Sequence, residues 1–340
     1  MGNGKNPVLN ILKRIAGTLY IPAAIYAVIF IIARSAGASY FGDFNTWRNI
    51  VLNTGATATT AYALATQIKN GRYDFSGGAI MTLGALLAIY FTSRIAENAF
   101  LYLIISIVVC VILSMFVATL YVYGRIPIII CTVGSAILFE SITLAFNGGR
   151  AQSISNIPAM NFLGKSMVPL ACLTMVSLVV YLIFNNFRVG GKQAQLLSSN
   201  QSAAVNIGIN EKKNVYMTFL LSGFLYGIAS LVYASQTFQV DTVSTVLGTV
   251  STAFSSMMPV FMGFYIGSFS TDAIGIFFSS FAVGILNYGI SVVAPTGYAG
   301  ACKNVVMGIF MIVFFFVSKK GPLFIKLCTQ RFGGKREGEE

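Results

Sequence analysis

The chain has 340 residues, of which 56% are hydrophobic and only 9% are charged, about a third of the charged fraction of an average soluble protein. Its net charge of +12 lies in short stretches between apolar segments and at the ends, so it does not indicate a compact nucleic-acid-binding module. Histidine is absent, which excludes Ser-His-Asp catalysis and histidine metal sites. We therefore expect an all-α polytopic membrane protein that is not an enzyme.

Apolar stretches long enough to cross a bilayer follow one another along the chain. We expect about ten transmembrane helices, at about residues 15–33, 50–68, 74–91, 99–121, 127–146, 167–184, 214–235, 249–269, 273–293 and 305–317. Placing both termini in the cytoplasm puts most of the 22 Lys and Arg residues on the cytoplasmic side, as the positive-inside rule requires. We expect a single transmembrane domain, residues 1–340, with cytoplasmic segments 1–14, 185–213 and 319–340.

The residues of the second and third expected spans predict what surrounds the second and how the third begins. The span at 50–68 is rich in small and hydroxyl residues, which favours contact with protein rather than lipid. Asp74 or Ser76 is placed to cap the following span before Gly77 and Gly78.

The later part of the chain contains a proline inside an expected span and two expected loops. Pro259 is expected to kink or break its span, which requires neighbouring protein or water to satisfy the freed backbone. Residues 147–166 and 295–304 are expected to form outside loops.

The segment 185–213 is the longest polar stretch between apolar ones, and Gln201 to Ile207 within it reads as a short amphipathic helix ended by Gly208. Its candidate caps are Ser198, Ser199 and Asn200. The residues expected to share one face are Ala203, Ala204 and Ile207. A short helix with small residues on one face suits docking into a groove of another protein, and the alternative is an ordinary solvated connector.

Catalytic and metal-binding motifs are missing. The chain lacks the Gly-x-x-x-x-Gly-Lys-Ser/Thr loop, so we expect no ATP hydrolysis by it. The cysteines form no Cys-x-x-Cys pair, and they predict neither a disulfide framework nor a zinc site: Cys110, Cys131, Cys172, Cys302 and Cys328. We expect no metal or cofactor on this chain.

Four blocks of sequence together resemble the permease subunits of ABC importers for ribose, xylose, galactose and related sugars, whose relatives carry nucleosides and autoinducer-2. The blocks are DFSGGAIMTLGALLA (74–88), GRIPIIICTVGSAILFESITLAFNGG (124–149), the stretch from NQSAAVNIGINEKK onward (200–235), and residues 262–320. The final block departs from the family, because MGFYIGSFSTDAIGIF keeps Gly263, Gly267 and Gly275 but lacks other glycines.

The resemblance implies a permease in the bacterial cytoplasmic membrane that works with a second permease chain, two cytoplasmic ATPase domains and an extracytoplasmic solute-binding protein. ATP and Mg²⁺ would then be bound by the partner ATPase. The resemblance also implies an ATPase-coupling loop at Asn200, Ala203, Ala204, Gly208 and Ile209.

A neutral sugar needs amide, hydroxyl and carboxyl partners, and glycines at helix N-termini let backbone N–H groups approach it. The candidate translocation path comprises Asn53, Thr57, Thr60, Gln67, Asp74, Ser76, Gly77, Gly78, Glu140 and Asn287. Structural roles are the alternative: a helix cap for Asp74, and contacts between helices for the amides and threonines. Glu140 is the only carboxyl group well inside a span, where a charge costs about 2.5–3.5 kcal/mol, unless it is wetted at the outer interface.

Other functions stay open. A branched-chain amino-acid permease would have the same architecture. A stand-alone carrier or channel would work without an ATPase, but the shortage of ionisable residues inside the spans counts against it. A scaffold that transports nothing would not require polar residues in several spans.

Overall fold

The computed structural model describes residues 7–38, 40–154, 166–294, 297–310, 312–313 and 316. It divides into two units, Met1–Val293 and Ala294–Glu340, which are described separately. The elements of the first unit are α1 Pro7–Ser35, α2 Phe44–Ile68, α3 Gly77–Ile95, α4 Ala99–Gly124, α5 Ile128–Ala145, η1 Phe146–Gly149, β1 Gln152–Ser153, α7 Met167–Leu182, η2 Ile183–Phe187, α8 Val189–Ser199, α9 Gln201–Asn206, α10 Glu211–Thr237, β2 Gln239–Val240, α11 Val250–Gly267 and α12 Asp272–Val293.

Within the described residues, 8 helices are long and apolar enough to cross a membrane: α1, α3, α4, α5, α7 with η2, α10, α11 and α12. The prediction of an all-α multi-pass membrane protein is confirmed. Helix α2 has 25 residues but is more polar than these eight. In the second unit, an apolar helix at Ala299–Phe310 overlaps the outside loop expected at 295–304, which is wrong from Ala299 onward. The predicted tail, 319–340, lies outside the described residues, as do residues 155–165 of the first expected outside loop.

Helix α2 lies inside the first unit, as its small and hydroxyl residues predict. Every residue from Ala61 to Ile68 is buried. Hydroxyl groups on α2 donate to carbonyl groups one turn earlier, for example from Thr54 to Ile50 at 2.7 Å and from Thr66 to Tyr62 at 2.9 Å. These hydroxyl groups are therefore satisfied within the helix, which can be covered by neighbouring helices.

Helices α4 and α10 cross closely because α10 carries glycines at the contact. A Cβ at Gly227 would lie 2.5 Å from the Cα of Ile107, so only glycine fits there. The Ser106 hydroxyl donates to the Gly227 carbonyl at 2.8 Å, and the Ser114 hydroxyl donates to the carbonyl of Phe219 at 2.7 Å. Small residues and interhelical hydrogen bonds are the usual means of joining helices within lipid.

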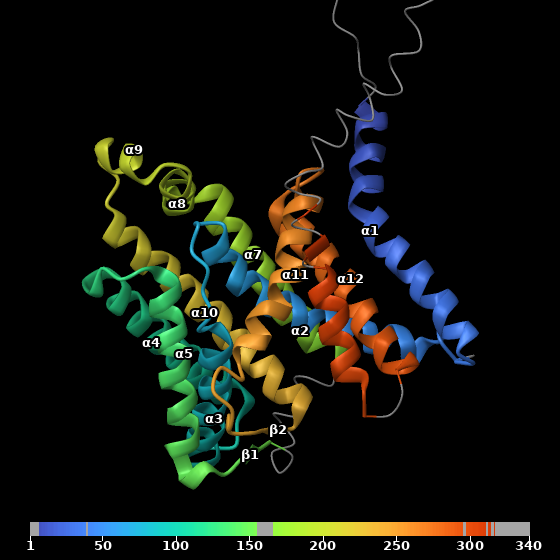
Figure 1. Ribbon diagram of the computed structural model, residues 1–340, viewed down its shortest axis with the longest axis horizontal. Coiled ribbons are helices and arrows are strands. Elements are labelled where there is room, and N and C mark those ends of the chain that lie inside the picture. The colour runs from blue at the N-terminus through green and yellow to red at the C-terminus, as the bar shows by residue number, and fades with distance from the viewer. Residues whose placement is uncertain are drawn as a thin grey trace, which may run out of the picture. The chain divides into compact units, whose positions relative to one another are not determined.

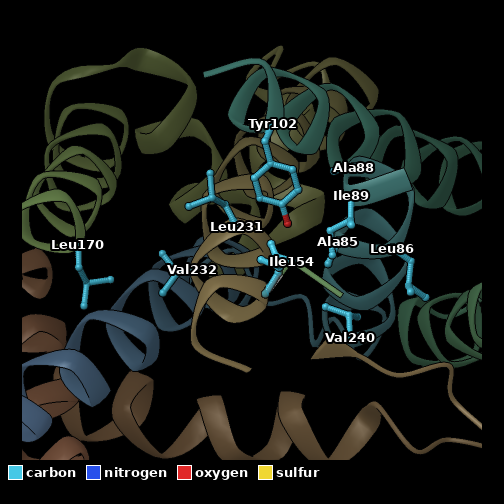
Figure 2. Close-up of a cluster of buried hydrophobic side chains, with 11 residues drawn as sticks. Ala85, Leu86, Ala88, Ile89, Tyr102, Ile154, Leu170, Leu231, Val232 and Val240 are labelled. Atoms are coloured by element: carbon cyan, nitrogen blue, oxygen red, sulfur yellow. The ribbon is translucent and has the colours of Figure 1, made fainter. Parts of the chain in front are cut away.

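A hydrophobic cluster joins α3, α4, α7 and α10 to β2 and to Ile154, the residue that follows β1 (Figure 2). Its buried members include Leu86, Tyr102, Leu231 and the strand residue Val240. β1 and β2 are antiparallel, with Gln152 opposite Val240. In Figure 1, α8 and α9 lie at one end of the first unit and the strands at the other. The cluster fixes the point from which the chain enters the segment after β2.

Helix α11 runs without a break from Val250 to Gly267, so Pro259 does not break its span, and the kink expected there stays a prediction. Its packing against α12 is close, because a Cβ at Gly263 would lie 2.7 Å from the Cα of Ile276. The Ser279 hydroxyl of α12 also donates to the Pro259 carbonyl. Neighbouring helices and hydroxyl groups allow a proline to remain inside a membrane helix.

Helices α2 and α12 are joined by an ion pair, Lys69 Nζ to Asp272 Oδ2 at 2.5 Å, with side chains 16% and 32% exposed. Asp272 is also in the first turn of α12, where a negative charge is favourable. We expect Asp272→Asn to cost about 0.5–1 kcal/mol and to lower the Tm in mild detergent by roughly 1–3 °C. The control is Glu97→Gln at an exposed acid. Equal Tm values for the two variants would contradict the prediction.

Candidate functional site

Helix α3 begins after a non-helical segment, Arg72–Ser76, that lies beside α5. The Thr132 hydroxyl of α5 donates to the carbonyl of Tyr73 at 3.4 Å. Asp74 Oδ1 accepts hydrogen bonds from the backbone N–H of Ser76 at 2.9 Å and from its hydroxyl at 2.6 Å. Ser76 holds the N-cap position of α3 but makes no side-chain cap bond, so side-chain capping of α3 by Asp74 or Ser76 is not observed.

The two glycines that open α3 let other segments approach its first turn. A Cβ at Gly77 would lie 2.2 Å from the Tyr226 hydroxyl of α10, and a Cβ at Gly78 would lie 2.2 Å from the backbone carbonyl oxygen of Thr249. Asp74 and Tyr226 are buried, and their side chains interact with each other. The start of α3 is therefore tightly enclosed.

The chain between β2 and α11, residues 241–249, returns along α5 and is called here the returning segment. The Thr242 hydroxyl donates to the Gly149 carbonyl at 3.1 Å, and the N–H of Val243 donates to the Thr143 hydroxyl at 3.0 Å. Non-helical backbone at membrane depth requires such partners, because lipid offers none.

Glu140 of α5 holds the end of the returning segment. Its Oε2 accepts from the N–H of Leu247 at 2.7 Å, and its Oε1 accepts from the N–H of Thr249 at 2.8 Å and from the Thr249 hydroxyl at 2.5 Å. The side chain is 3% exposed. Glu140 therefore has hydrogen-bond partners within the protein for both carboxyl oxygens.

Two helix N-termini thus meet inside the first unit, those of α3 and α11. Glu140 lies twelve residues beyond the start of α5, about 18 Å along a helix roughly 27 Å long. Thr249, which precedes α11, bonds to Glu140 and lies against Gly78. A second contact between the two helix starts is made by the rings of Phe75 and Phe254, whose centroids are 5.3 Å apart. Interrupted helices whose N-termini meet at membrane depth are a recurrent way to build a solute site.

Arg72 ties the segment before α3 to α10. Its Nη1 donates to the Thr218 hydroxyl at 2.9 Å, and the side chain is 6% exposed. Burial lowers the pKa of Arg72, while Tyr121 and the negative charge of Glu211 oppose that effect. Glu211 accepts a hydrogen bond from Gln201 of α9 at 2.7 Å. Gln201 and Arg72 therefore both bond to residues of α10, which lies between α9 and the segment that leads into α3.

The remaining predicted path residues lie on α2 and α12. Asn53, Thr57 and Thr60 are half-buried and donate to backbone carbonyls of α2 itself, at 2.8–2.9 Å. Gln67 is buried and donates to the Ser222 hydroxyl of α10 at 2.9 Å. The Asn287 side-chain oxygen is buried without a hydrogen-bond partner among the described residues. Of the ten predicted path residues, contacts link Asp74, Ser76, Gly77, Gly78 and Glu140, and the role of every one in transport stays a prediction.

The polar loop forms two helices, α8 and α9, of which only the second is predicted from the sequence. Asn200 caps α9 by accepting from the N–H of Ala203 at 3.0 Å, and Gly208 follows with a φ of 90°. Ala204 and Ile209 are buried against Leu197 of α8. Ala203 is exposed and Ile207 is 71% exposed, so the prediction that Ala204 shares their face is wrong. Ala204 fixes α9 to α8, while Ala203 and Ile207 are exposed.

Comparison with known proteins identifies the family. Residues 46–315 match the family model described as "Branched-chain amino acid transport system / permease component". The chain belongs to this family.

Among curated relatives, the chain is 25% identical over 199 residues to the ribose import permease protein RbsC of Haemophilus influenzae. It is 23% identical over 220 residues to the D-allose transport system permease protein AlsC of Escherichia coli. These matches include 55% and 64% of the chain, and they span 60% and 66% of the length of the two relatives. Within the family, the chain is therefore similar to sugar permeases.

Sequence reasoning did not find Tyr226, Thr249 or the returning segment. Tyr226 lies in an apolar span, where its hydroxyl is the only available signal. Thr249 and Glu140 are 109 residues apart in the sequence, and no local pattern predicts that they meet.

Proposed function

We propose that the chain is the membrane permease subunit of an ATP-driven importer and forms the translocation path for a simple sugar. The observation that carries the proposal is the meeting of the α3 and α11 N-termini beside Glu140 in a chain similar to ribose and allose permeases. Backbone N–H groups at helix N-termini are unpaired donors, and hydroxyl-rich neutral solutes match them without a charged partner. Nucleosides share this chemistry and remain within the proposal.

The proposed path takes its polar groups from two places. Asp74 and Ser76 at the start of α3 supply a carboxyl group and a hydroxyl, and Gly77 and Gly78 let Tyr226 and Thr249 approach the same helix N-terminus. The half-buried amide and hydroxyl groups of α2, together with Asn287 on α12, supply hydrogen-bonding partners elsewhere along the route. A sugar that leaves water needs such replacements for its hydrogen bonds.

Energy for transport would come from partner subunits. We propose two cytoplasmic ATPase domains that bind ATP and Mg²⁺, a second permease chain, and an extracytoplasmic binding protein that delivers the solute. The exposed side of α9 is the proposed ATPase contact, because Ala203 and Ile207 are exposed on a helix fixed from behind by Ala204 and Ile209. Helix α10 connects this helix to the segment before α3, because Glu211 of α10 accepts from Gln201 and Thr218 of α10 accepts from Arg72.

The test is to tag the chain, express it with its genomic neighbours, purify it in mild detergent and reconstitute what co-purifies. We expect an ATPase subunit in the preparation and ATP-dependent uptake of D-ribose or D-allose by proteoliposomes supplied with the binding protein. Uptake of leucine in place of sugars would support a branched-chain amino-acid permease. Recovery of the chain alone, with solute flux in the absence of ATP, would contradict the importer and favour a carrier or channel.

A further inference from the structure

We propose that Glu140 is a positioning residue, which holds the returning segment and the first turn of α11 in place and does not itself bind the solute. This inference rests on the proposed transport function, and it assigns a different role to one residue of the predicted path. Its basis is the set of contacts between Glu140, Leu247 and Thr249.

The carboxyl oxygens of Glu140 are already occupied by the protein. They accept three hydrogen bonds, from the N–H of Leu247, the N–H of Thr249 and the Thr249 hydroxyl, at 2.7, 2.8 and 2.5 Å. A carboxylate offers about four lone-pair positions, so little capacity remains for a solute. At 3% exposure, the group is also enclosed by its neighbours.

The segment that Glu140 holds is not fixed by packing at its tip. Val246 and Leu247 are 77% and 38% exposed. Leu247 has a φ of 61°, in the left-handed region that a leucine adopts rarely and at a cost. The Gly248 N–H bonds only within the segment, to the Thr245 carbonyl at 3.1 Å. Thr242 and Val243 are bonded to Gly149 and Thr143 near the start of the segment, whereas at its end Leu247 and Thr249 are held by the hydrogen bonds to Glu140.

The restraint extends to α3 through Thr249. Its backbone carbonyl oxygen would lie 2.2 Å from a Cβ at Gly78, so Thr249 is in direct contact with the start of α3. The residue after it, Val250, begins α11. Glu140 therefore sets how closely the two helix N-termini of the proposed path approach each other, and its loss would widen or displace that meeting point.

The test measures the position of α11 and transport separately. Ala253, in the first turn of α11, is 4% exposed, and Ala88 in the cluster of Figure 2 is 0% exposed. Ala253→Cys and Ala88→Cys are made in a background without other accessible cysteines, and the rate of maleimide labelling is followed in membranes. Glu140→Gln is then added to each. An amide retains one acceptor oxygen and turns N–H groups towards the donors of the segment.

We expect Glu140→Gln to speed labelling of the Ala253→Cys thiol about tenfold through local opening, to leave the Ala88→Cys thiol unlabelled, and to reduce sugar uptake. Thr249→Val, which removes one of the three bonds, is expected to act in the same direction but less, and Thr249→Ser, which retains the hydroxyl, is expected to resemble the parent chain. If Glu140→Gln does not fold, Thr249→Val still tests the positioning role of Glu140.

Unchanged labelling of the Ala253→Cys thiol would overturn the inference, whether or not uptake falls, because loss of uptake alone would indicate direct contact with solute. Faster labelling of both thiols would overturn it as well, because it indicates general loosening of the bundle. The labelling needs no transport, so failure of the parent chain to import any sugar would contradict the proposed function without deciding the role of Glu140.

Discussion

Replacing Ala204 by Glu is expected to reduce both ATPase association and sugar uptake by about 100-fold or more. The reason is that a buried carboxylate without a partner costs several kcal/mol. Ala204 is 2% exposed and packs with Leu197 and Ile209 between α8 and the end of α9. The side chain of Glu does not fit there, so α9 must leave α8. A docking helix transmits force from an ATPase only while it is held against the permease.

The measurement is the amount of ATPase that co-purifies with each variant, together with ATP-dependent uptake. Ala204→Ser is the matched control, because its small hydroxyl can bond to the Asn200 carbonyl one turn earlier. Ile207→Glu tests the exposed side: Ile207 is 71% exposed, so the change leaves the packing of α9 intact but introduces a charge into the proposed contact. Normal ATPase recovery with both Ala204→Glu and Ile207→Glu would contradict a docking role for α9.

Local chemistry explains which parts of this loop could be predicted from the sequence. The α9 helix follows from a cap at Asn200 and a stop at Gly208, and both signals act within one turn. Helix α8 was not predicted, because it has few apolar residues, and its buried positions, Gly191, Ala194 and Leu197, become apparent only when their partners are known. The inward direction of Ala204 depends on the same partners.

In the membrane-spanning part as well, only features that depend on local sequence could be predicted. The burial of α2 was predicted from its small and hydroxyl residues, a property of composition. The role of Glu140 was not, because its partners lie more than 100 residues later in the sequence and belong to a segment without regular structure. A carboxyl group inside an apolar span predicts that a partner exists, since isolation is costly, but does not identify it. At this site, the hydrogen bonds between residues far apart in the sequence are therefore the part that could not be predicted from the sequence.

Gly78→Ala is expected to reduce uptake by about tenfold or more and to destabilise the protein by about 1–3 kcal/mol, the usual cost of overpacking. The added methyl group would lie 2.2 Å from the carbonyl oxygen of Thr249. This oxygen belongs to the backbone and cannot rotate away as a side chain can. The start of α11 must therefore shift away from α3, against the hydrogen bonds of Thr249 to Glu140.

Gly134→Ala is the matched control, because Gly134 lies on the exposed side of α5 and a Cβ there meets nothing within 4 Å. In a helix interior the change from Gly to Ala favours the helix by about 0.5–1 kcal/mol, so this variant should have an unchanged or slightly higher Tm and normal uptake. Uptake and Tm are measured for both variants in the same preparation. If Gly78→Ala behaves like Gly134→Ala, the α3 and α11 N-termini do not meet in the functional protein, and the proposed path must lie elsewhere. If only Gly78→Ala fails, the close approach of the two helices is required for transport.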